Sequence, residues 1–334
     1  MLNVIQVGVG GFGNCWLNVI KRHPECARFA GLVDLNAESL EKASALAGVP
    51  KENCFASLDG ALKAVEAEAV ICVTPPAHHR EVCVKALRAG KHVITEKPLA
   101  DTLINGKAMA SAAQKAGRIL MVSQNYRFVR WARTMRKLLE SQIVGKPGAC
   151  VVRFYKDPKF TGFRAEMAYP LIIDMSIHHF DLLRYITGSD AAEVAGRSWN
   201  PPWSVFKGDP SSILYFTMAN GLPVVYDATW ASRGPETPWS GDWEFECERG
   251  QIALRGEKIC ITQNGQTTEY TDYVEMPWQG QDFTLMEFID AIASDRQPET
   301  HAGDNLGSIA MVFAAVKAVQ TGKTVKVLCR RMMR

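Results

Sequence analysis

The first thirteen residues constrain the fold of this chain more than any other stretch. An apolar run, residues 4–7, leads directly into Gly8, Gly10 and Gly13, which have the spacing GxGxxG. In such a pattern the first glycine permits a tight turn, the second permits close approach of the backbone to a pyrophosphate, and the third permits close packing of a helix on a strand. The pattern therefore predicts a strand, a tight turn and the start of a helix.

An acidic residue stands where a dinucleotide-binding turn needs one. A second apolar run, residues 29–33, ends in Asp34, about 20 residues beyond the glycines, where a carboxylate would bind the adenosine ribose. Asp34 would accept hydrogen bonds from the 2′-hydroxyl and repel a 2′-phosphate, so we expect NAD as cofactor, with NADP less favoured. The alternative is that Asp34 caps a helix that starts near Ala37, although Asn36 is better placed for that role.

The bulk composition indicates an ordinary globular protein. The 334 residues exceed the usual size of one domain, so we expect two. The net charge of +3 gives no reason to expect a nucleic-acid partner. No apolar run reaches the roughly 20 residues of a membrane helix, and no signal-peptide pattern precedes the first strand, so we expect a cytoplasmic protein that does not contact a membrane. The nine cysteines include no CxxC pair and are expected to be free thiols, with Cys72 and Cys83 buried.

Short apolar runs alternate with helical stretches as far as about Ser123. The expected strands after the first are residues 29–33, 69–73, 92–95 and 119–122, and the expected helices are residues 40–46, 76–89 and 101–116. This alternation predicts an α/β fold with a doubly wound parallel sheet and helices on both faces. We therefore expect residues 1–123 to form a dinucleotide-binding domain.

The pattern changes in the second half, where strands are joined by hairpin signals. Asn220-Gly221 separates residues 213–218 from 224–230, and Asn264-Gly265 separates residues 259–262 from a run that ends at Tyr270. Asn-Gly suits a type I′ turn. Residues 124–334 are therefore predicted to form an α+β domain on an open, mainly antiparallel sheet. Its last helix, over residues 306–319, would end before Gly322.

A lysine stands at the carboxyl end of a predicted parallel strand. Glu96, Lys97 and Pro98 follow the strand over residues 92–95, and open α/β sheets bind their ligands at this edge. The proline excludes Lys97 from the helical region and raises the chance of a cis bond, which would fix the direction of the ammonium group. On position alone, the alternative of a solvated surface lysine stays open.

A second candidate group lies in a predicted helix over residues 171–188. Spacings of four and three would place Asp174, His178 and Asp181 on one face. A carboxylate four residues before an imidazole can orient its tautomer and raise its basicity, as a general base requires. The alternatives are that Asp174 marks the helix start and that His178 is a core histidine. For Asp181 we prefer an ion pair with Arg184. No third ligand for a metal is evident, so no metal site is expected.

Other charged residues carry weaker signals. The four arginines Arg127, Arg130, Arg133 and Arg136 drift by about 60° at each step of three, so they form no single anion-binding patch. We interpret the last three as solvated charges and keep Arg127, next to Asn125 and Tyr126, as a candidate site residue. His78-His79, after Thr74-Pro75-Pro76, is expected to be a cofactor-edge or capping feature.

Five segments together resemble the glucose-fructose oxidoreductase and inositol dehydrogenase family (Gfo/Idh/MocA). They are GVGGFG at residues 8–13, TPPAHH at 74–79, EKP at 96–98, QNYRF at 124–128 and DMSIHHFDLLRYITG at 174–188. The resemblance covers nearly the whole chain, and EKP followed by DxxxH is its specific part. It implies an N-terminal Rossmann domain and a C-terminal domain whose open sheet often serves oligomerisation.

The resemblance also implies roles for individual residues. Lys97, Asp174 and His178 would surround the reacting hydroxyl, with His178 as base, Lys97 polarising the oxygen and Asp174 orienting its neighbours. Apart from the resemblance, Tyr126, Arg127 and Arg164 are candidates to join Lys97 and His178 in substrate binding. The two arginines could bind a carboxylate or a phosphate, and whether they face the pocket stays open. The residues that match cofactor-lining positions of the family are Gly8, Gly10, Phe12, Gly13, Asp34, Thr74, Pro75, His79, Glu96 and Asn125.

The expected activity is therefore an NAD-dependent dehydrogenase that oxidises a secondary hydroxyl of a sugar, sugar derivative or cyclitol, in a homodimer or homotetramer. Many family members have a glycine-rich stretch before DxxxH and a glycine within it, whereas this chain has Tyr169-Pro170-Leu171 and Ser176. This departure leaves the substrate open. The alternatives are a noncatalytic sensor or corepressor that binds the dinucleotide, and a glycosidase that uses a retained NAD.

Overall fold

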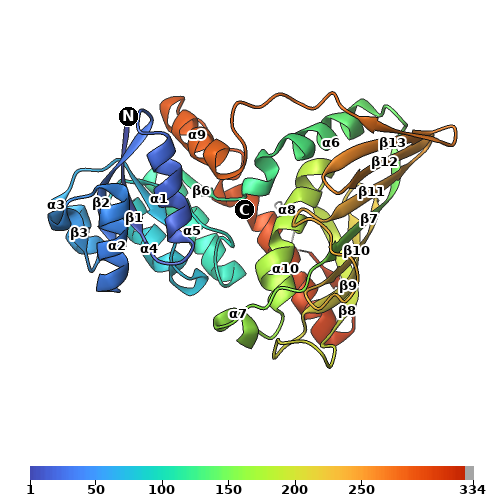
Figure 1. The fold of residues 1–334 in the computed structure, drawn as a ribbon, viewed down its shortest axis with the longest axis horizontal. Coiled ribbons are helices and arrows are strands. Elements are labelled where there is room, and N and C mark those ends of the chain that lie inside the picture. The colour runs from blue at the N-terminus through green and yellow to red at the C-terminus, as the bar shows by residue number, and fades with distance from the viewer. Residues whose placement is uncertain (328–334) are drawn as a thin grey trace. The chain divides into compact units, whose positions relative to one another are not determined.

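The chain separates into two units close to where the sequence pattern changes. The computed structural model describes residues 1–327. Unit 1 consists of Met1–Asn125 and Trp278–Leu306, and unit 2 consists of Tyr126–Pro277 and the described residues from Gly307 onward. Figure 1 shows the elements of both units, many of them labelled. The structure thus assigns to unit 1 a C-terminal stretch that the sequence-based division at residue 123 places in the second domain.

Unit 1 is built on a six-stranded parallel sheet in the order β3-β2-β1-β4-β5-β6. This is the strand order of dinucleotide-binding α/β folds. The strands are β1 (Leu2–Val7), β2 (Ala27–Val33), β3 (Cys54–Phe55), β4 (Ala69–Cys72), β5 (His92–Thr95) and β6 (Leu120–Val122). The helices are α1 (Gly13–Arg22), α2 (Ala37–Ala47), η1 (Lys51–Asn53), α3 (Leu58–Ala64), α4 (Pro76–Arg88), α5 (Leu103–Ala116) and α9 (Gly280–Ala293). The predicted parallel sheet is confirmed, while β3, η1 and α3 were not predicted.

Local signals explain where the helices of unit 1 begin. The side chains of Asn36, Ser57 and Thr102 each accept a hydrogen bond from a backbone N–H in the first turn of α2, α3 and α5. Gly48 and Gly117 end α2 and α5 in the left-handed conformation. Asn36 is therefore the cap of α2, as preferred from the sequence.

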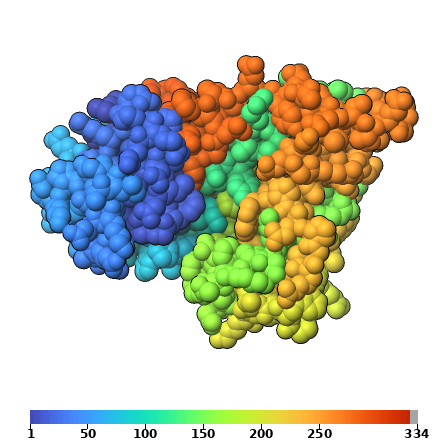
Figure 2. Space-filling view, viewed as in Figure 1, coloured from blue at the N-terminus to red at the C-terminus, as the bar shows by residue number. Residues whose placement is uncertain are grey.

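Polar contacts attach α9 to the N-terminal part of unit 1. Asp282 binds Arg22 Nη2 and His23 Nε2, both at 2.8 Å. The backbone of Thr300 also accepts a hydrogen bond from Val122 N at the end of β6. In Figure 2 the orange segment that contains α9 lies against the blue N-terminal residues. These contacts are the reason that Trp278–Leu306 belongs to unit 1.

Unit 2 is built on a nine-stranded mixed sheet in the order β14-β13-β12-β11-β7-β10-β9-β8-β15. Among the strands that the structure describes in this sheet, only β7 and β10 pair in parallel, so the predicted mainly antiparallel sheet is confirmed. The strands are β7 (Pro147–Tyr155), β8 (Ala191–Trp199), β9 (Ser211–Met218), β10 (Pro223–Thr229), β11 (Asp242–Cys247), β12 (Gly250–Arg255), β13 (Lys258–Gln263), β14 (Gln266–Tyr270) and β15 (Val325–Lys326). The helical elements are η2 (Asn125–Phe128), α6 (Arg130–Ser141), α7 (Phe163–Glu166), η3 (Leu171–Met175), α8 (Ser176–Thr187) and α10 (Ala302–Thr321), of which η2 and α10 begin in unit 1.

The strands of this sheet bury one face. In β9, Leu214 and Phe216 are fully buried, whereas Ile213 and Tyr215 are 47% and 48% exposed. Figure 1 shows α6, α8 and α10 on one side of the sheet. The alternation of buried and exposed residues is that of a sheet with helices on one face and solvent on the other.

The two Asn-Gly hairpins have different turns. Asn264 and Gly265 both have positive φ, 52° and 74°, as the predicted type I′ turn requires. Gly221 has φ 87°, but Asn220 keeps a negative φ, and Gly221 N donates to Met218 O. Residues 219–222 connect the two strands, and Met218 N donates to Leu222 O. A type I turn followed by one left-handed glycine therefore closes the hairpin, and the type I′ prediction is wrong here.

The helix α10 is longer than the predicted helix over residues 306–319. It spans 20 residues instead of 14 and ends before Gly322, whose φ is 65°. By length and composition it is able to cross a membrane, although 67% of its most apolar window is buried inside the protein. Its longest uninterrupted apolar run, residues 309–316, is nevertheless short of the roughly 20 residues of a membrane helix, and the burial identifies α10 as a core helix.

Candidate functional site

The carboxyl edge of the parallel sheet collects the cofactor residues that the sequence predicts. Gly8 follows β1, Asp34 follows β2, Thr74 lies just beyond β4, and Glu96 follows β5. All of these strands are parallel, so their carboxyl ends meet at one edge. Ligands of open α/β sheets bind at this edge, next to the point where the strand order reverses. In unit 1 that point is β1, between β2 and β4.

The glycine turn is held in a form that excludes larger residues. Gly8 has φ 88°, and a Cβ atom on it would lie 2.6 Å from the carbonyl oxygen of Val73. A Cβ atom on Gly13 would lie 2.5 Å from the carbonyl oxygen of Gly8. The buried Gln6 side chain donates to the carbonyl oxygens of Gly8 and Gly13 at 3.0 and 2.9 Å. Sequence reasoning found these glycines but missed Gln6, which lies within an apolar run.

The start of α1 leaves backbone donors available. Unlike α2, α3 and α5, this helix has no side-chain cap. Its first turn also contains no acidic residue. Within residues 1–327, the backbone N–H groups of Gly11 and Phe12 have no hydrogen-bond partner, and Phe12 is 55% exposed. Unpaired N–H groups and the positive end of the helix dipole form an anion site. The turn therefore fits the pyrophosphate of a dinucleotide.

Asp34 supports the same turn from the neighbouring strand. Its Oδ2 accepts hydrogen bonds from Val9 N at 2.9 Å and from Gly10 N at 3.4 Å, and its Oδ1 accepts one from Asn36 N at 2.9 Å. Two carboxylate oxygens offer about four lone-pair positions, so this residue has capacity for a further donor such as a ribose hydroxyl. Asp34 thus fits the ribose position of the predicted dinucleotide.

His79 occupies a buried position behind this edge. It is fully buried, its Nδ1 lies 2.9 Å from the carbonyl oxygen of Pro98, and its Nε2 lies 2.8 Å from the carbonyl oxygen of Thr74. Both ring nitrogens are thus engaged by backbone oxygens of the two loops that follow β4 and β5. This geometry favours a role in holding those loops over the direct cofactor contact that the resemblance implies.

Lys97 is half-buried and precedes Pro98 across a cis peptide bond. The neighbouring Glu96 is buried, and its carboxylate accepts hydrogen bonds from Trp16 Nε1 at 2.7 Å and from Gln281 Nε2 at 3.1 Å. Burial raises the pKa of Glu96. Glu96 therefore ties the Lys97 loop to α1 and α9, and sequence reasoning missed both Trp16 and Gln281 as its partners.

Asp174 and His178 lie in two different helical segments. Asp174 belongs to a π-helical turn, η3, in which Ser176 N donates to Leu171 O, and His178 belongs to the α-helix α8. The prediction of one regular helix over residues 171–188 is therefore wrong at its start. Single π-helical turns occur frequently at functional sites.

The ring of His178 is buried against a tyrosine. The rings of Tyr126 and His178 stack with centroids 4.3 Å apart and an angle of 18°, and His178 is 7% exposed. Burial raises the pKa of Tyr126 to about 12, so this side chain stays neutral at physiological pH. Unit 2 therefore brings together two of the predicted substrate residues.

Arg164 contacts the other member of the DxxxH motif. Its Nε donates to Asp174 Oδ2 at 2.6 Å, and its guanidinium group lies over the rings of Phe160 and Phe163 at 5.3 and 4.8 Å. The Arg164 side chain is 36% exposed, compared with 15% for Asp174. The carboxylate of Asp174 is thus oriented by an arginine that two aromatic rings hold in place.

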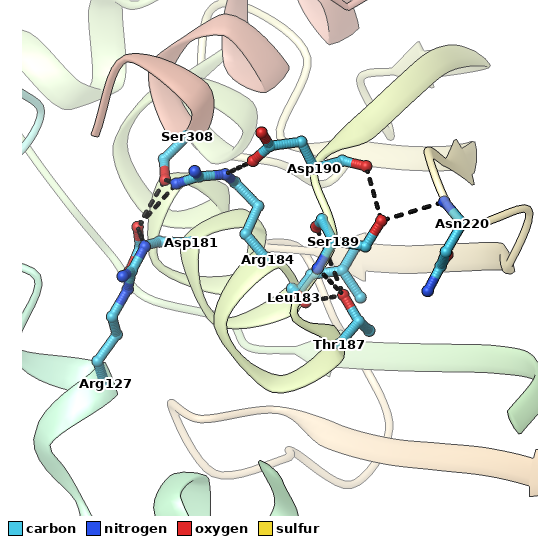
Figure 3. A network of polar contacts seen from close by, with 9 residues as sticks. All are labelled: Arg127, Asp181, Leu183, Arg184, Thr187, Ser189, Asp190, Asn220 and Ser308. Carbon is cyan, nitrogen blue, oxygen red and sulfur yellow. Dashed lines mark hydrogen bonds and ion pairs between the residues drawn. The ribbon is translucent and has the colours of Figure 1, made fainter. Parts of the chain in front are cut away.

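Arg127 takes part in a buried ion pair. Its Nε and Nη2 donate to the two carboxylate oxygens of Asp181 at 2.5 and 2.7 Å, and both residues are at most 5% exposed. Figure 3 shows that the pair continues through Ser308 to Arg184. Arg184 itself lies 3.9 Å from Asp181. The expected Asp181–Arg184 contact exists, but Arg127 is the closer partner, which favours a structural role for Arg127 over substrate binding.

The other three arginines are not all solvated. Arg133 and Arg136 are half-buried and lie over the Tyr185 ring at 5.0 and 4.8 Å, whereas Arg130 is exposed and lies over Tyr273. The prediction of surface charges is therefore wrong for Arg133 and Arg136, because Tyr185 offers an aromatic face to this side of α6. Among residues 1–327, no group of three metal-ligating side chains has a geometry that would hold a metal ion.

Comparisons with known proteins agree with the geometry of both units. Residues 2–124 match the oxidoreductase family with an NAD-binding Rossmann fold, GFO_IDH_MocA, and residues 132–253 match the GFO/IDH/MocA C-terminal domain. The chain is 28% identical to the uncharacterised protein y4oX of Sinorhizobium fredii, over 97% of this chain and 95% of that protein. It is 27% identical to 1,5-anhydro-D-fructose reductase of Ensifer adhaerens, over 89% and 91%.

A solved structure shares the complete fold. The crystal structure of an oxidoreductase from Agrobacterium radiobacter in complex with NAD+, L-tartaric acid and magnesium aligns with a TM-score of 0.87. The two proteins are 23% identical, and the alignment covers 98% of each chain. The glycine turn, the strand order and the two matched domains lead to one assignment: this chain belongs to the GFO/IDH/MocA family of oxidoreductases.

Proposed function

We propose that this protein is an NAD-dependent dehydrogenase that oxidises a secondary hydroxyl of a sugar, sugar derivative or cyclitol. The single observation that carries the proposal is the uncapped start of α1, where the N–H groups of Gly11 and Phe12 have no partner among residues 1–327. Asp34 binds the preceding turn through Val9 N. This arrangement fits a dinucleotide pyrophosphate and ribose. The relationship to 1,5-anhydro-D-fructose reductase supports a sugar-type substrate.

Asp34 is the basis for preferring NAD. Its carboxylate is fixed by Val9 N and Asn36 N at 2.9 Å each. A 2′-phosphate at the ribose would bring a second negative charge against a carboxylate that cannot move away, which would cost binding free energy. The carboxylate of Asp34 would instead accept a hydrogen bond from a ribose hydroxyl of NAD.

In the proposed reaction, bound NAD supplies the nicotinamide carbon that accepts the hydride. His178 removes the proton of the reacting hydroxyl, and the stacked ring of Tyr126 holds the imidazole in one plane. The ammonium group of Lys97 donates a hydrogen bond to the substrate oxygen and stabilises the negative charge that develops on it. Asp174, held by Arg164 at 2.6 Å, orients its neighbours.

The remaining features of the proposal concern the environment of the enzyme. We expect a cytoplasmic homodimer or homotetramer, with no nucleic-acid partner. The face of the unit 2 sheet that carries the half-exposed Ile213, Tyr215 and Val225 would provide the subunit contact.

The proposal is tested by incubating the purified protein with NAD or NADP and a panel of sugars, sugar acids and inositols, with the absorbance of reduced nicotinamide as readout. We expect turnover with NAD and a near-complete loss of activity in the Lys97→Ala variant. Lys115→Ala, which removes an exposed lysine on α5, is the matched control. Wild-type rates in Lys97→Ala on a good substrate would refute the assignment of Lys97.

Two other outcomes would change the proposed function. Tight NAD binding without turnover on the whole panel would favour a sensor or corepressor. Release of free sugar from a glycoside, without net formation of reduced cofactor, would favour a glycosidase that retains its NAD.

A further inference from the structure

Two consecutive residues of η2 contact two residues of α8 that lie one turn apart. Tyr126 stacks on His178 with a centroid distance of 4.3 Å, and Arg127 binds Asp181 through two hydrogen bonds. Because residues three apart lie on the same helix face, His178 and Asp181 present one surface to η2. The stacking contact and the ion pair therefore hold the same two backbone segments together.

The ion pair is rigid for three reasons. It is bidentate, and a planar guanidinium group fits both carboxylate oxygens in only one orientation. Both side chains are almost completely buried, at 5% and 1% exposed. Asp181 Oδ1 also accepts a hydrogen bond from Ser308 Oγ at 2.5 Å, which anchors it to α10.

The ion pair belongs to a larger polar cluster, which also contains Ser308, Arg184 and Asp190. The members farthest from Arg127 are held by hydrogen bonds as well. Arg184 Nη1 donates to Ser308 Oγ at 2.7 Å, and Arg184 Nε donates to Asp190 Oδ1 at 2.7 Å, at the start of β8. A Cβ atom on Gly307 would lie 2.6 Å from the Arg184 guanidinium carbon, so this guanidinium lies directly against the backbone of α10. Figure 3 shows the resulting chain of contacts from Arg127 through Asp181 and Ser308 to Arg184 and Asp190. The cluster thus connects η2, α8, α10 and the sheet.

We propose that Arg127 and Asp181 are positioning residues for the imidazole of His178, which they fix through the stacked ring of Tyr126. The inference rests on the proposed function, in which His178 is the base. Neither residue touches the substrate in this account. The Arg127–Asp181 pair sets the distance between η2 and α8, and that distance decides whether the Tyr126 ring lies flat on His178. Since a misplacement of about 1 Å can cost about a hundredfold in rate, a small movement of η2 would be visible in catalysis.

The test is Arg127→Lys, which keeps the charge but loses the two-pronged contact with Asp181. Arg136→Lys is the matched control, because Arg136 lies over the same Tyr185 ring as Arg127 but pairs with Glu140 at 2.7 Å. The first readout is the NMR signal of the His178 ring in protein without cofactor or substrate. The chain has seven histidines, so the His178→Gln variant identifies this signal, and Tyr126→Leu shows its position without the stacked ring.

We expect the His178 signal of Arg127→Lys to move toward that of Tyr126→Leu, while Arg136→Lys keeps the wild-type signal. On a substrate found in the panel, kcat should fall about tenfold to a hundredfold, with KM and the NAD dissociation constant within about twofold of wild type. If Arg127→Lys does not fold, Ser308→Ala removes only the hydroxyl group that anchors Asp181 and should move the same signal by a smaller amount.

An unchanged His178 signal in folded Arg127→Lys and Ser308→Ala would overturn the proposal and leave the cluster with a purely structural role. A shifted signal with unchanged kcat would instead refute His178 as the base while the positioning effect stands. The two failures are therefore distinguishable, and the spectroscopic result does not depend on knowing the substrate.

Discussion

The pH dependence of stability in unit 2 should be governed in part by His179, the buried neighbour of His178. The Nε2 atom of His179 lies 3.1 Å from the carbonyl oxygen of Trp239, and Nδ1 lies 2.8 Å from the hydroxyl oxygen of Tyr226. A carbonyl oxygen only accepts, so Nε2 carries the proton in the neutral ring, and the unprotonated Nδ1 faces the hydroxyl group of Tyr226. The same hydroxyl lies 2.9 Å from Ser176 Oγ, which donates to Leu171 O and so connects η3 with α8.

The size of the effect follows from the pKa of this histidine. Burial lowers the pKa of His179 from 6.5 to about 4. Between these two values the unfolded chain binds one more proton than the folded chain, so the free energy of unfolding rises with pH across this window. One pKa unit corresponds to about 1.4 kcal/mol, and the full shift therefore corresponds to about 3 kcal/mol. This stability is present above pH 6.5 and is lost as the pH falls toward 4.

The assay compares wild type with His179→Gln, which cannot become charged. Urea unfolding is followed by tryptophan fluorescence at several pH values between about 4.5 and 7.5. We expect the free energy of unfolding of the wild type to fall faster than that of the variant on acidification. The difference between the two free energies should decrease by most of the full effect of about 3 kcal/mol. His78→Gln, an exposed histidine on α4, controls for the loss of one histidine. Parallel curves for wild type and His179→Gln would refute the reasoning.

Three further substitutions test the turn geometry. Gly13→Ala would place a Cβ atom 2.5 Å from the carbonyl oxygen of Gly8, a contact that no rotation relieves, so NAD affinity should fall by at least about tenfold; wild-type affinity in a calorimetric titration would contradict this. Asp34→Ala should raise the affinity for NADP relative to NAD, and an unchanged ratio of the two dissociation constants would rule out the proposed ribose contact. Gly265→Ala, at φ 74°, should lower the free energy of unfolding by about 1 kcal/mol because an alanine is strained there; equal stability in urea would show that the hairpin relaxes.

Most of the unit 1 fold was predictable because its signals are local. The strand β5 has the predicted bounds, and β1, β2, β4 and β6 differ from prediction by a few residues. The short elements β3 and α3 were missed, because a strand of two residues has no detectable periodicity. The attachment of α9 to unit 1 was also missed. Its contacts join Arg22 to Asp282 across 260 residues, and no local pattern contains that information.

The candidate site shows the same division between local and long-range information. Gly8, Asp34 and Lys97 could be located because strand ends and spacing place them at one edge of the sheet. The hydrogen-bond partners of Glu96, next to Lys97, could not be located in this way. Trp16 and Glu96 are 80 residues apart, and Gln281 and Glu96 are 185 residues apart. Such partners are chosen by the packed structure, since a buried carboxylate requires donors wherever the fold can supply them.

Asp181 shows how the spacing of residues on a helix can correctly predict an ion pair but miss the closer partner. The spacing of three predicts a pair with Arg184, and the two side chains do lie 3.9 Å apart. However, Arg127 reaches both carboxylate oxygens from 54 residues away, and a bidentate contact in a buried environment is stronger than a single contact at a longer distance. Arg184 is then available to bind Asp190 and Ser308. One local helix contact thus becomes part of a cluster that connects three helical elements with the sheet, through an ion pair whose two members come from η2 and α8.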